Sequence, residues 1–266
     1  MNQFKNLLHT LRGMSCVAVA YSGGVDSTLL LRAACDALGE KNVLALSCVG
    51  ALHTEQERVE TQRSVERLSV RHVLCKVDVL AIAEVAENLP LRCYFCKKEL
   101  FSEMLRAARA EGFSVLCDGT NASDSAAYRP GLRALTELGV RSPLRDCGIT
   151  KADARQILRA LGMPEGERPS NSCLATRFPY HTRLTPELLA RVERAEQMLH
   201  AAGFPLCRVR VQDTLARIEL PYTEFVRFLN NTALHAAVKQ CGFTYITLDL
   251  DGYRSGSFDT QEVVGT

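Results

Sequence analysis

The chain has 266 residues, of which 47% are hydrophobic and 23% are charged. This composition excludes a disordered chain and allows one large domain or a domain with a smaller companion. A net charge of +2 argues against binding of nucleic acid that is dominated by electrostatic attraction. No apolar stretch approaches the roughly 20 residues that cross a bilayer, so we expect a cytoplasmic protein without a membrane partner.

Up to about residue 165, short apolar runs alternate with amphipathic segments of helical length. This alternation predicts an α/β fold whose doubly wound parallel sheet is covered by helices on both faces. The expected strands are 16–21, 43–49, 72–77 and 114–118, and the expected helices are 26–38, 54–68 and 97–111. Such sheets bind ligands at the carboxyl ends of their strands.

A smaller C-terminal α+β domain is expected after the segment GMPEGERPSNS. This segment is rich in Gly, Pro and Ser and interrupts the periodic pattern, so it predicts domains of 1–168 and 169–266. Thr185 is expected to cap a helix that begins at Pro186. Strands at 207–212, 215–220 and 245–252 and a helix at 225–240 complete the second domain.

The stretch AYSGGVDST follows the first expected strand and opens the first expected helix after it. Backbone N–H groups and the positive end of a helix dipole at such a turn attract an anion, and glycines let phosphate approach the backbone. Asp26 is a candidate ligand for a phosphate-bridging Mg²⁺. The alternative is a tight turn that binds nothing. The candidate phosphate ligands are Ser22, Gly23, Gly24, Asp26 and Ser27.

A second polar stretch, DGTNASD, follows the strand expected at 114–118. Asp, Thr, Asn and Ser all suit the cap of a helix, so a capping turn and a ligand loop are both open from this stretch alone. Its position at a strand end makes Thr120 and Asn121 candidates for the same nucleotide site.

The chain contains eleven cysteines, and most of them stand in apolar runs as buried, reduced thiols would. Cys93 and Cys96 form a Cys-x-x-Cys pair, whereas Cys173 lies in the polar boundary segment near Arg177. Three interpretations are open: an iron–sulfur cluster held by three cysteines, a zinc site with His181 as a fourth ligand, and unligated thiols.

The motif Ser-Gly-Gly-x-Asp-Ser resembles the PP-loop of the ATP pyrophosphatase superfamily. Over nearly its whole length the chain is similar to the LarE family of sulfur transferases, which act in the synthesis of the nickel-pincer nucleotide cofactor. The stretches that carry the resemblance are YSGGVDSTLL, RCYFCKKELF, DGTNASD, RPGLRALTELGVRSPL, PSNSCLATRFPY, RVRVQDTLARIE and DLDGYRSGS.

The resemblance implies that ATP and Mg²⁺ are used to adenylylate a carboxylate of pyridinium-3,5-biscarboxylic acid mononucleotide, which then becomes a thiocarboxylate. In some members the cysteine that matches Cys173 gives up its own sulfur. In others, cysteines that match Cys93, Cys96 and Cys173 hold a [4Fe-4S] cluster whose extra sulfide is the donor. Because this chain has all three cysteines, we expect the cluster version, with an unidentified sulfur source. The family also implies a homo-oligomer, a hexamer.

Arg208 and Arg210 alternate on an expected strand, so their side chains share one face and suit a clamp for the substrate phosphate. The alternative is a solvated sheet face. The resemblance favours the clamp and adds Glu196 as an acidic residue near the phosphate or a metal, whereas its position on an expected helix is by itself typical of a solvent-facing charge. Arg177 is a further candidate for the substrate phosphate, as Arg92 and Arg254 are for an anion, although each by itself is typical of an ordinary surface charge.

Two residues depart from the family pattern near Cys173: His181 stands where Gly is usual, and Thr176 stands where Ser is common. Three other functions are open. The first is an ammonia-dependent ligase resembling NAD synthetase, in which the cysteines are idle. The second is a tRNA thiolase, which requires a surface for RNA. The third is an adenine-nucleotide sensor that releases no pyrophosphate.

Overall fold

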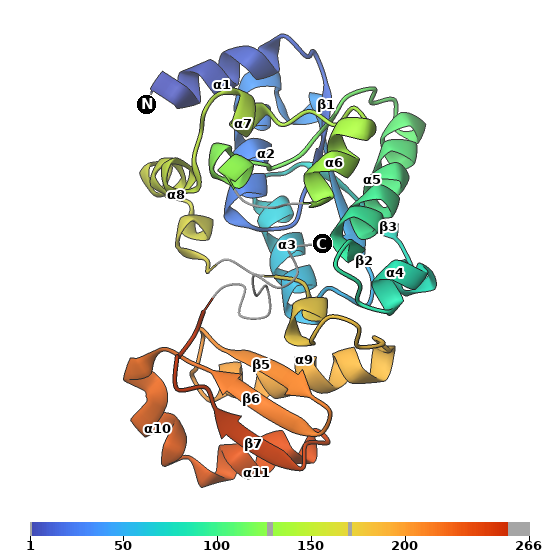
Figure 1. The fold of residues 1–266 in the computed structure, drawn as a ribbon. Coiled ribbons are helices and arrows are strands. Elements are labelled where there is room, and N and C mark those ends of the chain that lie inside the picture. The colour runs from blue at the N-terminus through green and yellow to red at the C-terminus, as the bar shows by residue number, and fades with distance from the viewer. Residues whose placement is uncertain (1, 127–129, 170–171, 255–266) are drawn as a thin grey trace. The chain divides into compact units, whose positions relative to one another are not determined.

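The computed structural model describes residues 2–126, 130–169 and 172–254 (Figure 1). The chain divides into two compact units. The first comprises Met1–Val79 and Cys93–Asn171, and the second comprises Leu80–Arg92 and Ser172–Thr266. None of the helices in the described ranges combines the length and apolar character that crossing a membrane requires.

A parallel sheet of four strands forms the centre of the first unit, which confirms the predicted α/β fold. The strands are β1 (Val17–Ala20), β2 (Val43–Val49), β3 (Arg71–Lys76) and β4 (Leu116–Cys117), in the order β3-β2-β1-β4. The strands β2 and β3 lie on one side of β1, and β4 lies on its other side. This order places a topological switch point between β1 and β4, where a ligand is expected.

Helices cover both faces of this sheet because the strands β1 and β2 are apolar on both sides. Val17 and Val19 of β1 pack into one core cluster, and Ala18 and Ala20 pack into the opposite one. The first cluster contains residues of α1 (Asn2–Arg12), α2 (Val25–Leu38), α3 (Glu55–Arg67), α7 (Pro143–Asp146) and α8 (Lys151–Ala160). The second contains residues of α5 (Arg92–Ala110) and α6 (Pro130–Glu137).

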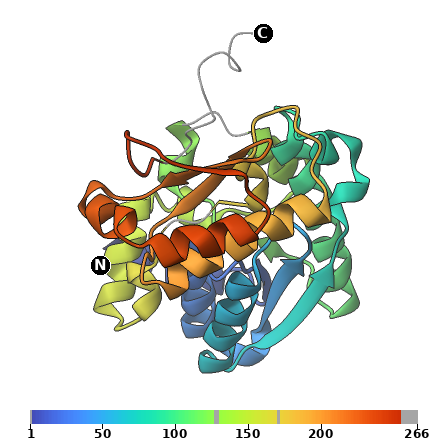
Figure 2. The ribbon, with the colours of Figure 1, turned by 90° about the horizontal axis from the view of Figure 1, so that it is seen from below.

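The second unit is a smaller α+β unit built on a sheet of three strands in the order β5-β6-β7. The strands are β5 (Arg208–Gln212), β6 (Leu215–Glu219) and β7 (Tyr245–Leu248), and β6 pairs antiparallel with β5 and parallel with β7. Its helices are α4 (Ala83–Ala86), α9 (Pro186–Ala201), α10 (Phe225–Leu229) and α11 (Thr232–Gln240). Figure 2 shows α9 and α11 side by side, and these two helices are in contact.

Two helix predictions need correction. The helix expected at 225–240 is two helices, because the Asn231 side chain accepts a hydrogen bond from the Leu234 backbone N–H and starts α11 anew. The helix expected at 97–111 begins five residues earlier, at Arg92, so that both Cys93 and Cys96 lie in it. The Thr185 cap with Pro186 at the first helical position is confirmed.

The segment Leu80–Arg92 belongs to the second unit although it is distant from it in sequence. The Asn88 side-chain amide donates to the Pro179 carbonyl at 2.8 Å, and the Leu184 N–H donates to the Ala86 carbonyl at 2.6 Å. Backbone groups are satisfied across a long sequence separation here, which ties this segment to the chain that follows Cys173.

Candidate functional site

The glycine-rich turn after β1 gathers its polar groups around the start of α2. Ser22 Oγ and Ser27 Oγ share a hydrogen bond of 3.1 Å, and Ser27 Oγ donates to the Gly24 carbonyl at 3.1 Å. Gly24 is the N-cap residue of α2, and no side chain makes a capping hydrogen bond there. The first turn of α2 therefore offers N–H groups and a dipole to an anion, as the sequence predicts for a phosphate site.

Close backbone approaches explain two glycines at this turn. Gly23 has φ of +72°, and a Cβ on it would lie 2.5 Å from Thr61 Oγ1 of α3. A Cβ on Gly119, which follows β4, would lie 2.9 Å from the Ser27 backbone nitrogen. The second approach joins the loop after β4 to the first turn of α2 at the switch point. Sequence reasoning noted the stretch containing Gly119 but missed this role.

The loop after β4 is held by its own side chains. Asp118 Oδ2 accepts from the Thr120 hydroxyl and, at 3.2 Å, from the Thr120 N–H, whereas Asp118 Oδ1 accepts from Ser142 Oγ at 2.6 Å. Asn121 Oδ1 accepts from the Ser123 N–H at 2.8 Å. Thr120 and Asn121 are both buried. The loop is thus a rigid turn at the strand end, and Thr120 has a structural hydrogen bond besides its proposed nucleotide role.

Asp26 projects from the first turn of α2 next to a cation. Lys151 Nζ, from the first residue of α8, lies 2.5 Å from Asp26 Oδ2. Asp26 Oδ1 is buried and has no hydrogen-bond partner among the described residues. Burial raises the pKa of Asp26 although Lys151 lowers it. One carboxylate oxygen therefore faces an ammonium ion and the other is unsatisfied, which fits a ligand of Mg²⁺.

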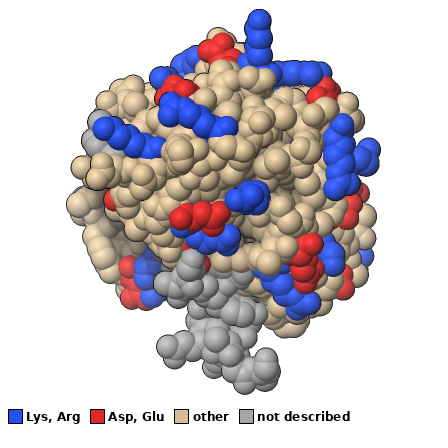
Figure 3. Space-filling view, turned by 90° about the horizontal axis from the view of Figure 1, so that it is seen from above, with Lys and Arg blue, Asp and Glu red and all other residues tan. Residues whose placement is uncertain are grey.

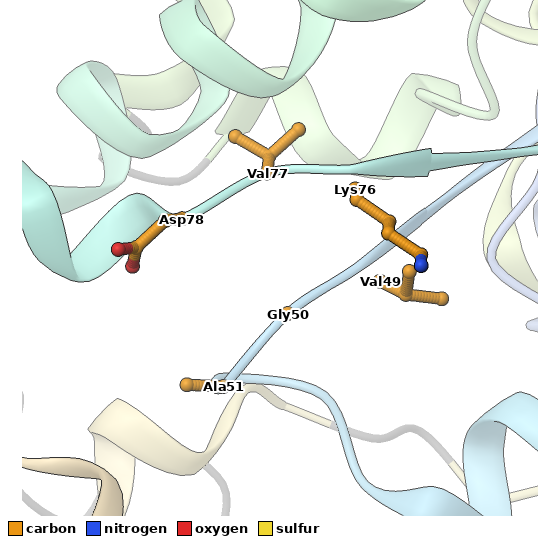
Figure 4. A pocket seen from close by; sticks show the side chains of 6 residues that line it. All are labelled: Val49, Gly50, Ala51, Lys76, Val77 and Asp78. Carbon is orange, nitrogen blue, oxygen red and sulfur yellow. The ribbon is translucent and has the colours of Figure 1, made fainter.

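An open cavity of about 490 Å³ lies at the carboxyl ends of β2 and β3. Its lining residues are Val49, Gly50, Ala51, Lys76, Val77 and Asp78. Figure 4 shows the Lys76 ammonium and the Asp78 carboxylate at opposite ends of this opening. Because β2 and β1 are neighbouring parallel strands, the cavity and the glycine-rich turn lie at the same, carboxyl-terminal end of the sheet. Sequence reasoning did not find it.

The cysteines of the chain fall into two groups by environment. Cys75, Cys117, Cys207 and Cys241 are buried, and burial raises the pKa of Cys117 to about 12, which is typical of an unreactive thiol. Cys93 is exposed and Cys96 is half-buried; their spacing places both on one face of the first turns of α5. They belong to the first unit and Cys173 belongs to the second. Within the described ranges, no three His, Cys, Asp or Glu side chains gather as a metal site would require.

Cys173 is held through its backbone by the buried side chain of Arg177. Arg177 Nη1 donates to the carbonyl oxygens of Ser172 at 2.7 Å and Cys173 at 3.2 Å. Thr176 Oγ1 also donates to the Cys173 carbonyl at 2.8 Å. The other side of the Arg177 guanidinium pairs with both carboxylate oxygens of Glu196, at 3.0 and 2.9 Å. This bidentate pair fixes the turn that carries Cys173.

Glu196 is buried inside the second unit, so it is not the solvent-facing helix charge that its sequence position alone suggests. Burial raises the pKa of this carboxyl, but the Arg177 and Arg208 guanidiniums outweigh that effect and hold the pKa below its ordinary value. Glu196 Oε1 also accepts from the Val209 N–H at 2.9 Å, which links α9 to β5. The Glu196 carboxylate is therefore ionised, and both of its oxygens accept hydrogen bonds within the second unit.

Arg208 and Arg210 are also buried, which excludes the solvated sheet face. Arg210 Nε lies 3.1 Å from each carboxylate oxygen of Glu219 on β6, and Arg210 Nη1 donates to the Thr176 carbonyl at 2.6 Å. The Arg208 guanidinium lies 5.3 Å from the ring centroid of Tyr253. Glu219 is fully buried and was not found by sequence reasoning, because an alternating strand does not reveal which charges are paired.

Three buried guanidiniums, those of Arg177, Arg208 and Arg210, lie in the second unit together with the buried carboxylates of Glu196 and Glu219. Guanidinium groups can bind phosphate through charge-assisted hydrogen bonds. The other candidate arginines differ: Arg92 stacks 4.4 Å above the Tyr180 ring, and Arg254 pairs with the Asp251 carboxylate at 2.9 Å.

The two departures from the family pattern have different structural consequences. His181 has φ of +66°, a left-handed conformation that glycine adopts without strain, and its N–H donates to the Asn88 carbonyl at 3.2 Å. Thr176 makes its hydrogen bonds through the hydroxyl that Ser would also provide. The first substitution adds local strain, whereas the second preserves the contact to Cys173.

The chain is similar in sequence to several known proteins over almost its whole length. It is 37% identical over 251 residues to the pyridinium-3,5-bisthiocarboxylic acid mononucleotide synthase of Lactiplantibacillus plantarum, which covers 94% of this chain and 91% of that protein. It is 38% identical over 261 residues to an uncharacterized protein of Synechocystis, which covers 97% of each. An uncharacterized protein of Methanocaldococcus jannaschii is 28% identical over 90% of this chain and 91% of its own length. A scan of protein-family models finds no match.

Replacing Glu196 by Ala leaves the Arg177 guanidinium buried without its carboxylate, so we expect a loss of about 3–5 kcal/mol in the free energy of unfolding. Gln197→Ala, at the next and exposed position of α9, is the matched control and should stay within about 0.5 kcal/mol of wild type. Urea denaturation measures both. Similar small losses for the two variants would contradict the structural role of the pair.

Proposed function

Because the chain belongs to the LarE family of pyridinium-3,5-bisthiocarboxylic acid mononucleotide synthases, which are sulfur-transferring enzymes, we propose that it is an ATP-dependent sulfur transferase. It adenylylates a carboxylate of pyridinium-3,5-biscarboxylic acid mononucleotide and converts that carboxylate to a thiocarboxylate. The observation that carries the ATP-dependent step is the α2 N-terminus, which has no side-chain cap, next to the half-buried Asp26 carboxylate, whose Oδ1 has no hydrogen-bond partner among the described residues.

In this proposal the turn after β1 holds the β- and γ-phosphates of ATP. The N–H groups of the first turn of α2 and the hydroxyls of Ser22 and Ser27 bind phosphate oxygens. Mg²⁺, held by Asp26, would neutralise charge on the leaving pyrophosphate. Lys151 supplies a positive charge beside the same carboxylate. Thr120 and Asn121 line the nucleotide site from the neighbouring strand end.

The chemistry consists of two displacements. A substrate carboxylate oxygen attacks the α-phosphorus, the bond to the bridging oxygen breaks, and pyrophosphate leaves. A sulfur nucleophile then attacks the acyl carbon, and AMP leaves with the former carboxylate oxygen. The protein contributes positioning of the two reactants and stabilisation of the negative charge on both leaving groups.

We propose that Cys93, Cys96 and Cys173 hold a [4Fe-4S] cluster. Three thiols are a suitable ligand set, and Cys93 and Cys96 share one accessible face of α5. The bound cluster would supply the sulfide that becomes the thiocarboxylate sulfur. Arg177 and Thr176 hold the Cys173 carbonyl, and so fix the backbone from which this thiol projects.

The second unit receives the phosphate of the substrate nucleotide in this proposal. Arg177, Arg208 and Arg210 are buried in this unit, and the fork of a guanidinium suits bidentate binding of a phosphate, which supports the proposal. Residues 1–168 then form the nucleotide-activating domain, and residues 169–266 form the substrate and oligomerisation domain. We propose a hexamer, as the family resemblance implies, and a cytoplasmic location.

The alternative of a tRNA thiolase receives little support from the charge on the one face that Figure 3 shows. On the face drawn in Figure 3, the described lysines and arginines are scattered, with acidic residues among them. A protein that binds the RNA backbone gathers basic residues in a patch. A small nucleotide substrate requires no such patch.

Asp26→Asn and Cys173→Ser separate the two half-reactions. Asp26→Asn should reduce both pyrophosphate release and thiocarboxylate formation by about 100-fold or more, because the metal ligand is lost. Cys173→Ser should retain substrate-dependent pyrophosphate release but form no thiocarboxylate. A phosphate-release assay with added pyrophosphatase and mass spectrometry of the products measure the two steps. Cys16→Ser is the matched control. Thiocarboxylate from Cys173→Ser would place the sulfur donor elsewhere.

Anaerobic purification followed by iron and sulfide analysis tests the cluster. Wild type should carry about four irons per chain, and Cys93→Ala should lose them together with the visible absorption. Cys48→Ser, which changes a cysteine outside the proposed ligand set, is the control. If wild type stays free of iron after reconstitution, Cys173 becomes the sacrificial sulfur donor and the cluster assignment is wrong.

The pH profile of pyrophosphate release should depend on Lys151. Only the ionised Asp26 carboxylate binds Mg²⁺, so activity falls as the pH drops through its pKa. Lys151 lowers that pKa, which burial otherwise raises. Lys151→Met should therefore move the acid limb to higher pH, when each profile is normalised to its own plateau. Lys239→Met is the exposed control. An acid limb that stays in place or moves to lower pH would exclude this charge coupling.

A further inference from the structure

The back of the glycine-rich turn is held by Arg168, a residue that the proposed reaction leaves without a role. Arg168 Nη1 donates to the Gly23 carbonyl at 2.7 Å. Beside it, Thr61 Oγ1 donates to the Ser22 carbonyl at 3.4 Å. Two successive carbonyls of the turn therefore point to α3 and to the segment that follows α8.

The two contacts also fix the direction of the N–H groups of the turn, because each carbonyl shares a planar peptide unit with the following N–H. In a planar trans peptide, the carbonyl and the following N–H point in opposite directions, and the described residues contain no cis peptide. The N–H groups of Gly23 and Gly24 thus face away from Thr61 and Arg168. The Gly24 N–H lies 3.4 Å from Ser22 Oγ, on the side of the turn that carries the serine hydroxyls. Successive N–H groups on one side of a turn make a concave site for an anion.

Arg168 is itself fixed by a buried network. Its Nη2 donates to Ser64 Oγ at 3.3 Å and lies 3.8 Å from Glu165 Oε1. Ser64 Oγ donates in turn to Glu165 Oε1 at 2.8 Å, and Arg67 pairs with the same carboxylate. Glu165 is fully buried and Ser64 is nearly so. A guanidinium with several fixed partners loses little freedom when it holds a carbonyl, so the contact to Gly23 is preorganised.

We propose that Arg168 is a positioning residue for the phosphates: it holds the peptide between Gly23 and Gly24 so that the N–H groups of the turn face the β- and γ-phosphates. Arg168 acts from behind the turn and does not touch the nucleotide. Its charge is balanced by Glu165 and by Glu60, 3.9 Å away. This inference rests on the proposed function, because it requires a phosphate ligand at the turn.

If Arg168 positions the turn, its replacement should weaken binding only of ligands that carry the β- and γ-phosphates, because in the proposed function only these phosphates contact the turn. Arg168→Met should weaken binding of magnesium pyrophosphate about ten-fold, which is the factor expected for one hydrogen bond from a charged donor. The affinity for AMP, which lacks these phosphates, should stay within about two-fold. Arg168→Lys should give an intermediate loss, because an ammonium cannot hold Gly23 and Ser64 in the same fork.

Isothermal titration of the full-length chain with magnesium pyrophosphate and with AMP tests the proposal. Ser64→Ala removes a partner of Arg168 with little change in volume and should show the same selectivity with a smaller loss. Arg159→Met, at an exposed arginine of α8, is the control and should match wild type. Thermal unfolding of each variant monitors folding.

Pyrophosphate affinity equal to that of wild type in folded Arg168→Met or Arg168→Lys would overturn the positioning role. Equal losses for pyrophosphate and AMP would also overturn it, because they indicate a general disturbance of the site. If wild type binds neither pyrophosphate nor ATP, the proposed function itself fails, and the result with Arg168 is then not what decides it.

Discussion

The candidate nucleotide site depends on close packing around the turn that precedes α2. Gly119, in the loop after β4, leaves no room for a side chain beside the Ser27 backbone, and Gly23 turns with a positive φ against Thr61 of α3. The Gly119 contact lies at the switch point between β1 and β4. The α/β fold thus supplies the position of the site, and these two glycines allow the backbone itself to form its surface.

A second constraint is the set of buried ion pairs around Cys173. Burying a guanidinium is costly unless a carboxylate and further acceptors satisfy it, and Arg177 has both. Because one guanidinium connects the Cys173 backbone to Glu196, and Glu196 also accepts from Val209, the turn, α9 and β5 form one polar network. Such a network fixes the segment that carries Cys173 more tightly than its irregular backbone would allow alone.

Much of the fold was predictable from the sequence because both units obey simple periodicities. Apolar runs located β1 and β2 closely, and the Thr185-Pro186 pair located the start of α9. The break at Asn231 was not predicted, since a side-chain cap inside an amphipathic segment does not interrupt its period. The grouping of Leu80–Arg92 with the second unit depends on hydrogen bonds over about ninety residues, which local patterns cannot reveal.

The candidate site was predictable where chemistry is local and not where it depends on tertiary contacts. Ser22, Gly23 and Asp26 stand in one motif, whereas Lys151 and Arg168 reach that motif from more than a hundred residues away. Adenylylation of a substrate carboxylate moves one carboxylate oxygen into AMP, so a substrate labelled with ¹⁸O in its carboxylates tests this step. One ¹⁸O should appear in the phosphate of the released AMP. AMP without label, or ADP and phosphate as the products, would contradict it.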